Sequence, residues 1–98
     1  MTKEEVIKHY TKSGLTIEEG FDKPGTVYEP HRHERTYLWT LFGSITLRKG
    51  TDDWRTYTTG EECVIEDGEV HEAKIGPEGW KYIAAFDAEE AKKYEDAH

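Results

Sequence analysis

Cysteine is almost absent from this sequence, with Cys63 the only one among 98 residues. A single cysteine excludes an internal disulfide, and it also excludes zinc or redox sites built on paired cysteines. No stretch approaches the roughly 20 consecutive apolar residues of a membrane span. The polar start MTKEEVIKHY does not have the pattern of a signal peptide. We therefore expect a cytoplasmic protein that makes no membrane contact.

Positive charge is also scarce, since 13 lysines and arginines face 21 aspartates and glutamates, for a net charge of -8. Such a surface repels phosphate backbones, so we expect no nucleic-acid partner. A chain of 98 residues can bury one modest core. We expect a single domain over residues 1–98.

Helical periodicity is confined to the two ends of the chain. Thr2 with Glu5 forms a capping box for a helix within residues 1–14, and Asp87 with Glu90 does the same for residues 87–98. Between them, turn residues recur every 8 to 12 positions, which indicates short strands. We expect strands in residues 15–21, 26–33, 37–49 and 54–58, and three more within 59–86. This order predicts an all-β sandwich or small barrel.

The segment YLWTLFGSITLRK is the clearest strand. Leu41, Ile45 and Leu47 fall on one face by alternation, and we expect Trp39 to pack in the core. Gly43 lies inside the strand and predicts a bulge or a tight bend.

Two of the five histidines, His31 and His33, are one residue apart after Pro30. Pro30 disfavours a helix, and in a strand residues i and i+2 share a face, so the two imidazoles should project side by side. Such a pair can bind one metal ion through its ring nitrogens. His71, which follows a tight Asp67–Gly68 turn, is a candidate third ligand. The alternative is that all three are ordinary solvated or hydrogen-bonded histidines, as we expect for His9 and His98 in the terminal helices.

The spacing of glycines around these histidines resembles the two motifs of the cupin family. In the first motif, Gly25 is followed by five residues, His31, one residue and His33, with Gly43 further on. In the second, Gly60 is followed by five residues, Glu66, Asp67, Gly68, two residues and His71. Glu66 stands where the family has Pro, and Ile75 stands where it has Asn.

This resemblance implies a cupin double-stranded β-helix, or jelly-roll barrel, with its core at about residues 15–86. It implies that His31, His33 and His71 bind a divalent transition metal at one mouth of the barrel. The ligand set leaves Fe, Zn, Ni, Cu and Mn open. Barrels of this family tend to pair through sheet edges, so the resemblance also implies a homodimer, with the 15–21 strand as a candidate edge.

The sequence departs from the family at the glutamate that follows the histidine pair. Its place falls on Thr36, Tyr37 or Leu38, and none of these carries a carboxylate. Tyr37 shares parity with the histidine pair, so we expect it to point inward, either as a catalytic residue or as a barrel-lining aromatic. Glu34 has the opposite parity and is expected to be a solvated surface charge.

These observations favour a mononuclear metalloenzyme that acts on a small organic molecule by dioxygenase-like or Lewis-acid chemistry, for example an oxygenase or an isomerase. The missing glutamate keeps a second hypothesis open, a non-catalytic cupin that binds or senses a small molecule. A third hypothesis is a scaffold that has lost its chemistry and serves oligomerisation.

Overall fold

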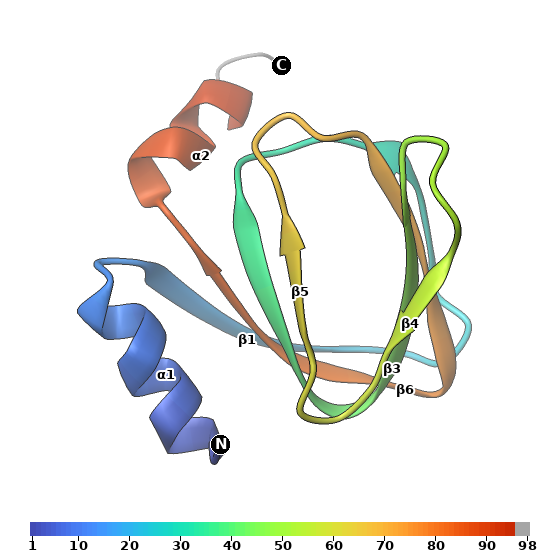
Figure 1. Ribbon diagram of the computed structural model, residues 1–98, viewed down its shortest axis with the longest axis horizontal. Helices are drawn as coiled ribbons and strands as arrows, with labels where there is room; N and C mark the ends of the chain where they lie inside the picture. The colour runs from blue at the N-terminus through green and yellow to red at the C-terminus, as the bar shows by residue number, and fades with distance from the viewer. Residues whose placement is uncertain (96–98) are drawn as a thin grey trace.

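Six antiparallel strands curl into a barrel, and the two short terminal helices both lie to one side of it (Figure 1). The computed structural model describes residues 1–95. The elements are α1 (Lys3–Lys12), β1 (Thr16–Asp22), β2 (Val27–His31), β3 (Thr36–Lys49), β4 (Arg55–Tyr57), β5 (Glu62–Ile65), β6 (His71–Phe86) and α2 (Ala88–Glu95). Within this part of the chain, no helix is long and apolar enough to span a membrane.

The two long strands, β3 and β6, organise the sheet. β6 pairs with β1, β2 and β3, while β3 also pairs with β4 and β5. Because each long strand has different partners along its length, the sheet curls around an interior (Figure 1). The expectation of three short strands in 59–86 is wrong. The Gly76–Gly79 segment lies inside the single strand β6, as an irregularity in its pairing with β3.

Gly43 is the bulge that the sequence predicts, and it changes which residues of β3 face inward. Its φ of +77° lies in the left-handed region, and the carbonyl oxygen of Gly79 occupies the place where a Cβ would stand. Before the bulge the buried positions are even-numbered, as at Leu38, and after it they are odd-numbered, as at Ile45. The expected common face of Leu41 with Ile45 is therefore wrong.

Apolar side chains form two clusters, one on each side of the sheet. The interior cluster includes Ile45, Ile65 and Trp80, and Cys63 is buried in it. The outer cluster packs Val6 and Tyr10 of α1 against β6 and β3. Val6 and Tyr10 are four residues apart and therefore share the face of α1 that covers the sheet.

Both helices begin as predicted. The Thr2 side chain accepts a hydrogen bond from the Glu5 N–H, and the Glu5 carboxylate accepts one from the Thr2 N–H. At α2, Asp87 Oδ1 accepts hydrogen bonds from the N–H groups of Glu89 at 2.8 Å and Glu90 at 3.3 Å. The last three positions of the expected second helix, including His98, lie outside the described residues.

Candidate metal centre

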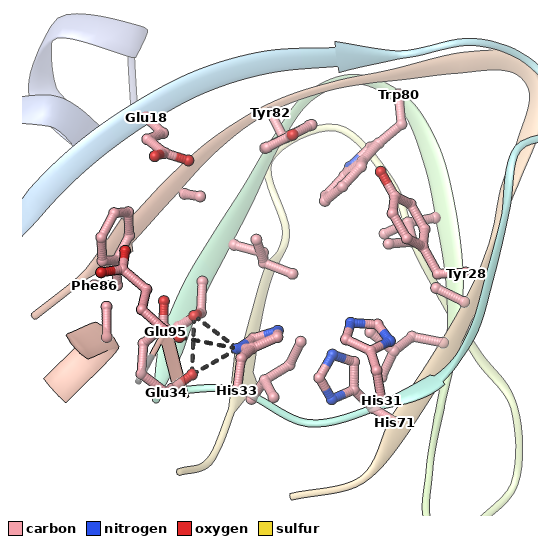
Figure 2. Close-up of a pocket in the computed structure, with 18 residues that line it drawn as sticks. Glu18, Tyr28, His31, His33, Glu34, His71, Trp80, Tyr82, Phe86 and Glu95 are labelled. Carbon is pink, nitrogen blue, oxygen red and sulfur yellow. Dashed lines mark hydrogen bonds and ion pairs between the residues drawn. The ribbon is translucent and has the colours of Figure 1, made fainter. Parts of the chain in front are cut away.

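His31, His33 and His71 converge on one cavity of the barrel, which confirms the geometry expected from the sequence, and His31 remains exposed to solvent (Figure 2). One ring nitrogen from each lies within 4.8 Å of those of the other two. The ring centroids are 4.2 Å apart for His31 and His71, 4.6 Å for His33 and His71, and 5.4 Å for His31 and His33. Distances of this size allow three imidazoles to share one ion.

A bulge in β2 directs the histidine pair into the barrel. Tyr28 pairs with Ala73 and His31 pairs with His71, so one extra residue lies on β2 between these positions. Pro30 falls in this interval and has no N–H to offer the ladder. In a regular strand, Tyr28 and His31 would point to opposite faces, but here both line the same cavity.

The backbone fixes the tautomer of all three rings. Nδ1 of His31 lies 2.8 Å from the carbonyl oxygen of Glu29, and Nδ1 of His33 lies 2.7 Å from that of Glu34. Nδ1 of His71 lies 2.9 Å from the carbonyl oxygen of Glu69. A carbonyl oxygen can only accept, so each Nδ1 carries the proton and each Nε2 keeps its lone pair for a metal.

His71 is the most deeply buried member of the group, with 3% of its surface exposed. The pKa of His71 is lowered to about 4, chiefly by burial and also by the neighbouring His33 and His31, while the hydrogen bond to the Glu69 carbonyl opposes this shift. The ring is therefore neutral at physiological pH, as a metal ligand must be.

A cavity of about 400 Å³ extends from the histidines toward the end of the barrel next to α2 (Figure 2). Its walls combine small and branched apolar side chains with aromatic rings and a few carboxylates. The aromatic and acidic part of the lining includes Tyr28, Glu18, Glu34, Tyr82, Phe86 and Glu95. A space of this volume accommodates a small organic molecule.

Thr36 and Glu34 occupy the region where the cupin pattern has a glutamate. Thr36 Oγ1 lies 3.4 Å from His33 Nδ1 and donates a 3.1 Å hydrogen bond to the Glu34 carbonyl oxygen. The Glu34 carboxylate lies 3.8 Å from His33 Nδ1, and only 15% of the side chain is exposed. The expectation that Glu34 is a solvated surface charge is therefore wrong, because it lines the cavity.

Tyr37 does not point inward with the histidines, so the sequence-based placement is wrong. Its side chain packs in the outer cluster, with its ring centroid 5.7 Å from that of Tyr10 in α1. Trp39 and Leu41 lie on the same outer side. Counting parity through the residues between His33 and β3 fails because they form a turn rather than a continuous strand.

Sequence reasoning missed the aromatic wall of the cavity. Trp80 and Tyr82 stack with centroids 4.0 Å apart, and the Trp80 N–H donates a 2.9 Å hydrogen bond to Thr40 Oγ1. Their alternation along a strand, WKY, was a usable signal. The preceding GPEG segment hides this signal, because its glycines and proline are typical of a turn between strands.

The donor set fits a divalent transition metal. Three neutral imidazoles leave the full positive charge of such an ion uncompensated and leave coordination positions free for a small molecule. The same set suits zinc and other first-row metals, so ligand chemistry does not choose among them.

No protein-family model and no curated protein matches the sequence. Solved structures do match. An RmlC-like cupin with a double-stranded β-helix fold from Methanocaldococcus jannaschii has a TM-score of 0.70 at 14% identity, over 83% of this chain and 75% of that protein.

Two enzymes have the same fold. The DMSP lyase DddQ from Ruegeria pomeroyi has a TM-score of 0.68 at 15% identity, over 76% of this chain and 38% of the lyase. An oxalate decarboxylase from B. subtilis has a TM-score of 0.67 at 22% identity, over 74% of this chain and 21% of the decarboxylase. This chain thus spans well under half the length of either enzyme. At these identities the likeness concerns the fold, and it confirms that the chain has the double-stranded β-helix fold of the cupins.

Proposed function

We propose that this protein is a mononuclear metalloenzyme in which His31, His33 and His71 bind one divalent transition metal. A small organic molecule would occupy the adjacent cavity. The observation that carries the proposal is the shared orientation of the three rings, each held by a hydrogen bond from Nδ1 to a backbone carbonyl. This arrangement supplies three converging Nε2 lone pairs without any further rearrangement of protons.

A bound metal would polarise an oxygen-bearing group of the substrate or act as a redox centre. The chain's own side chains supply the rest of the site. The rings of Trp80 and Tyr28 face the histidines across the cavity and would limit the size and orientation of the bound molecule (Figure 2). The Glu34 carboxylate lies beside His33 within the same cavity and could accept a proton there.

Zinc titration against a chromophoric competitor tests the proposal. We expect one ion per chain, and we expect His71→Ala to weaken affinity by about 100-fold or more, because it removes one of three ligands. His9→Ala is the matched control, since His9 is exposed on α1 and should leave affinity unchanged. His33→Ala provides a second ligand variant at a less buried position. Unaltered zinc affinity in both ligand variants, with folding verified by circular dichroism, would reject the proposal.

The second candidate, a binding or sensor protein without catalysis, is favoured by Thr36, which brings a hydroxyl rather than a carboxylate to the site. Turnover separates the two candidates. We would assay small diketones, thiols, keto acids and sugars under air with the metal-loaded protein. Turnover that disappears in His31→Ala establishes the enzyme, whereas binding without turnover across the panel establishes the sensor.

A further inference from the structure

We infer that the mouth of the cavity binds a positively charged organic group, so that the substrate class is a small zwitterion. Its oxygen-donor end would face the histidines and its ammonium-type end would face the mouth. The placement of the oxygen-donor end at the histidines rests on the proposed function. The placement of the ammonium-type end rests only on the residues at the mouth of the cavity.

Three carboxylates from different parts of the chain line the side of the cavity toward α2, and Glu34 is the one beside His33. Glu18 comes from β1, Glu34 from the segment between β2 and β3, and Glu95 from α2 (Figure 2). The 18 lining residues include no lysine or arginine. An anionic group would therefore meet repulsion at this end, and a cationic group would meet attraction.

Among the residues that the structure describes, these three carboxylates have no lysine or arginine partner. Within residues 1–95, no lysine or arginine nitrogen lies within 4.0 Å of any of the three. Uncompensated like charges around one opening leave a negative potential that a bound cation would relieve.

The mouth suits an organic cation better than a metal ion. Within the described residues, the three histidines are the one group of ligating side chains whose atoms gather within 4.8 Å, so the mouth carboxylates lie too far apart to enclose an ion together. The aromatic rings of Tyr82 and Phe86 lie beside Glu18 in the same wall (Figure 2). An alkylated ammonium can contact such ring faces while its charge interacts with the surrounding carboxylates.

The two ends of the cavity would then carry opposite charge. A divalent ion on three neutral imidazoles attracts an anionic or carbonyl oxygen, and the mouth attracts the cation. A zwitterion matches both ends in one orientation only, which would fix the atoms presented to the metal.

A matched pair of ligands tests the inference. 4-Trimethylammoniobutanoate and 5,5-dimethylhexanoate have the same shape and the same carboxylate, but the second has carbon in place of the charged nitrogen. Isothermal titration with the zinc-loaded protein should show about tenfold tighter binding of the zwitterion. Glu34→Gln and Glu95→Gln should each reduce this ratio by about two- to threefold. Glu89→Gln, on the same helix but outside the cavity, should leave the ratio unchanged.

Equal binding of the two ligands, or tighter binding of 5,5-dimethylhexanoate, would overturn the inference. A preference that persists fully in the double variant Glu34→Gln/Glu95→Gln would overturn it as well. If zinc does not bind, the proposed function fails separately, and the same pair is compared on the metal-free protein. A preference for the zwitterion there still supports a cation-binding mouth, and no preference rejects it.

Discussion

His31 and His71 lie opposite each other across the β2–β6 pair, with ring centroids 4.2 Å apart and ring planes at 59°. This contact joins the two parts of the sequence that carry the cupin-like motifs. It depends on the extra residue in β2, which directs both Tyr28 and His31 into one cavity. The predictions below follow from this arrangement and from the bends that produce it.

Tyr37→Phe should leave zinc affinity and any turnover unchanged, because Tyr37 packs against α1 on the outer side of the sheet. Thr36→Val, at the adjacent position, is the variant that should affect the metal site. It removes the hydroxyl that bonds the Glu34 carbonyl and lies 3.4 Å from His33 Nδ1, so it should change zinc affinity several-fold. The competitor titration measures both variants. A larger effect from Tyr37→Phe than from Thr36→Val would contradict this placement of the two side chains.

Stability of the metal-free protein should fall as pH drops from about 6.5 toward 4. Burial lowers the pKa of His71 to about 4, so in this interval the unfolded chain binds a proton that the folded chain does not. Above about pH 6.5 the ring of His71 is neutral in both the folded and the unfolded chain, so it no longer lowers the stability. At pH 5 the loss attributable to His71 should be about 2 kcal/mol relative to pH 7.5.

Urea unfolding at the two pH values measures this loss. His71→Gln should show a smaller decrease than the wild type, since it lacks the titrating ring. His9→Gln, altered at an exposed histidine, should follow the wild type. The explanation fails if all three proteins have the same pH dependence.

Gly43→Ala should be among the most destabilising glycine substitutions. It combines the cost of a positive φ, +77°, with a clash against the Gly79 carbonyl. Gly25→Ala is the matched control, because its φ of +78° is nearly the same and no atom lies within 4 Å of the added Cβ. We expect a loss of about 1–2 kcal/mol for Gly25→Ala and at least about 2 kcal/mol more for Gly43→Ala, by urea unfolding. Equal losses would show that the β3–β6 contact at Gly79 is not tight.

Local chemistry made much of this fold predictable. The caps at Thr2 and Asp87 and the positions of four strands could be read from residue type alone. The convergence of His71 with the distant histidine pair could be expected only through the resemblance of the glycine and histidine spacing to the two cupin motifs. Glycine spacing carries this information because turns with positive φ set where each strand begins.

The faces of the strands could not be predicted in the same way. Alternation assumes an uninterrupted ladder, and register shifts between Tyr28 and His31 in β2 and on both sides of Gly43 in β3 interrupt it. Leu41 is consequently on the outer side rather than with Ile45. Glu34 was misplaced for a related reason, since it belongs to a turn in which parity has no meaning.

The central claim is that three imidazoles bind one metal ion through Nε2. Crystals grown with zinc, measured at wavelengths on both sides of the zinc absorption edge, test it most directly. We predict one anomalous peak within about 2.0–2.1 Å of Nε2 of His31, His33 and His71, with each Nδ1 still bonded to its carbonyl. Absence of a peak at this position in fully zinc-loaded protein, or a His71 ring directed away from the other two, would contradict the account.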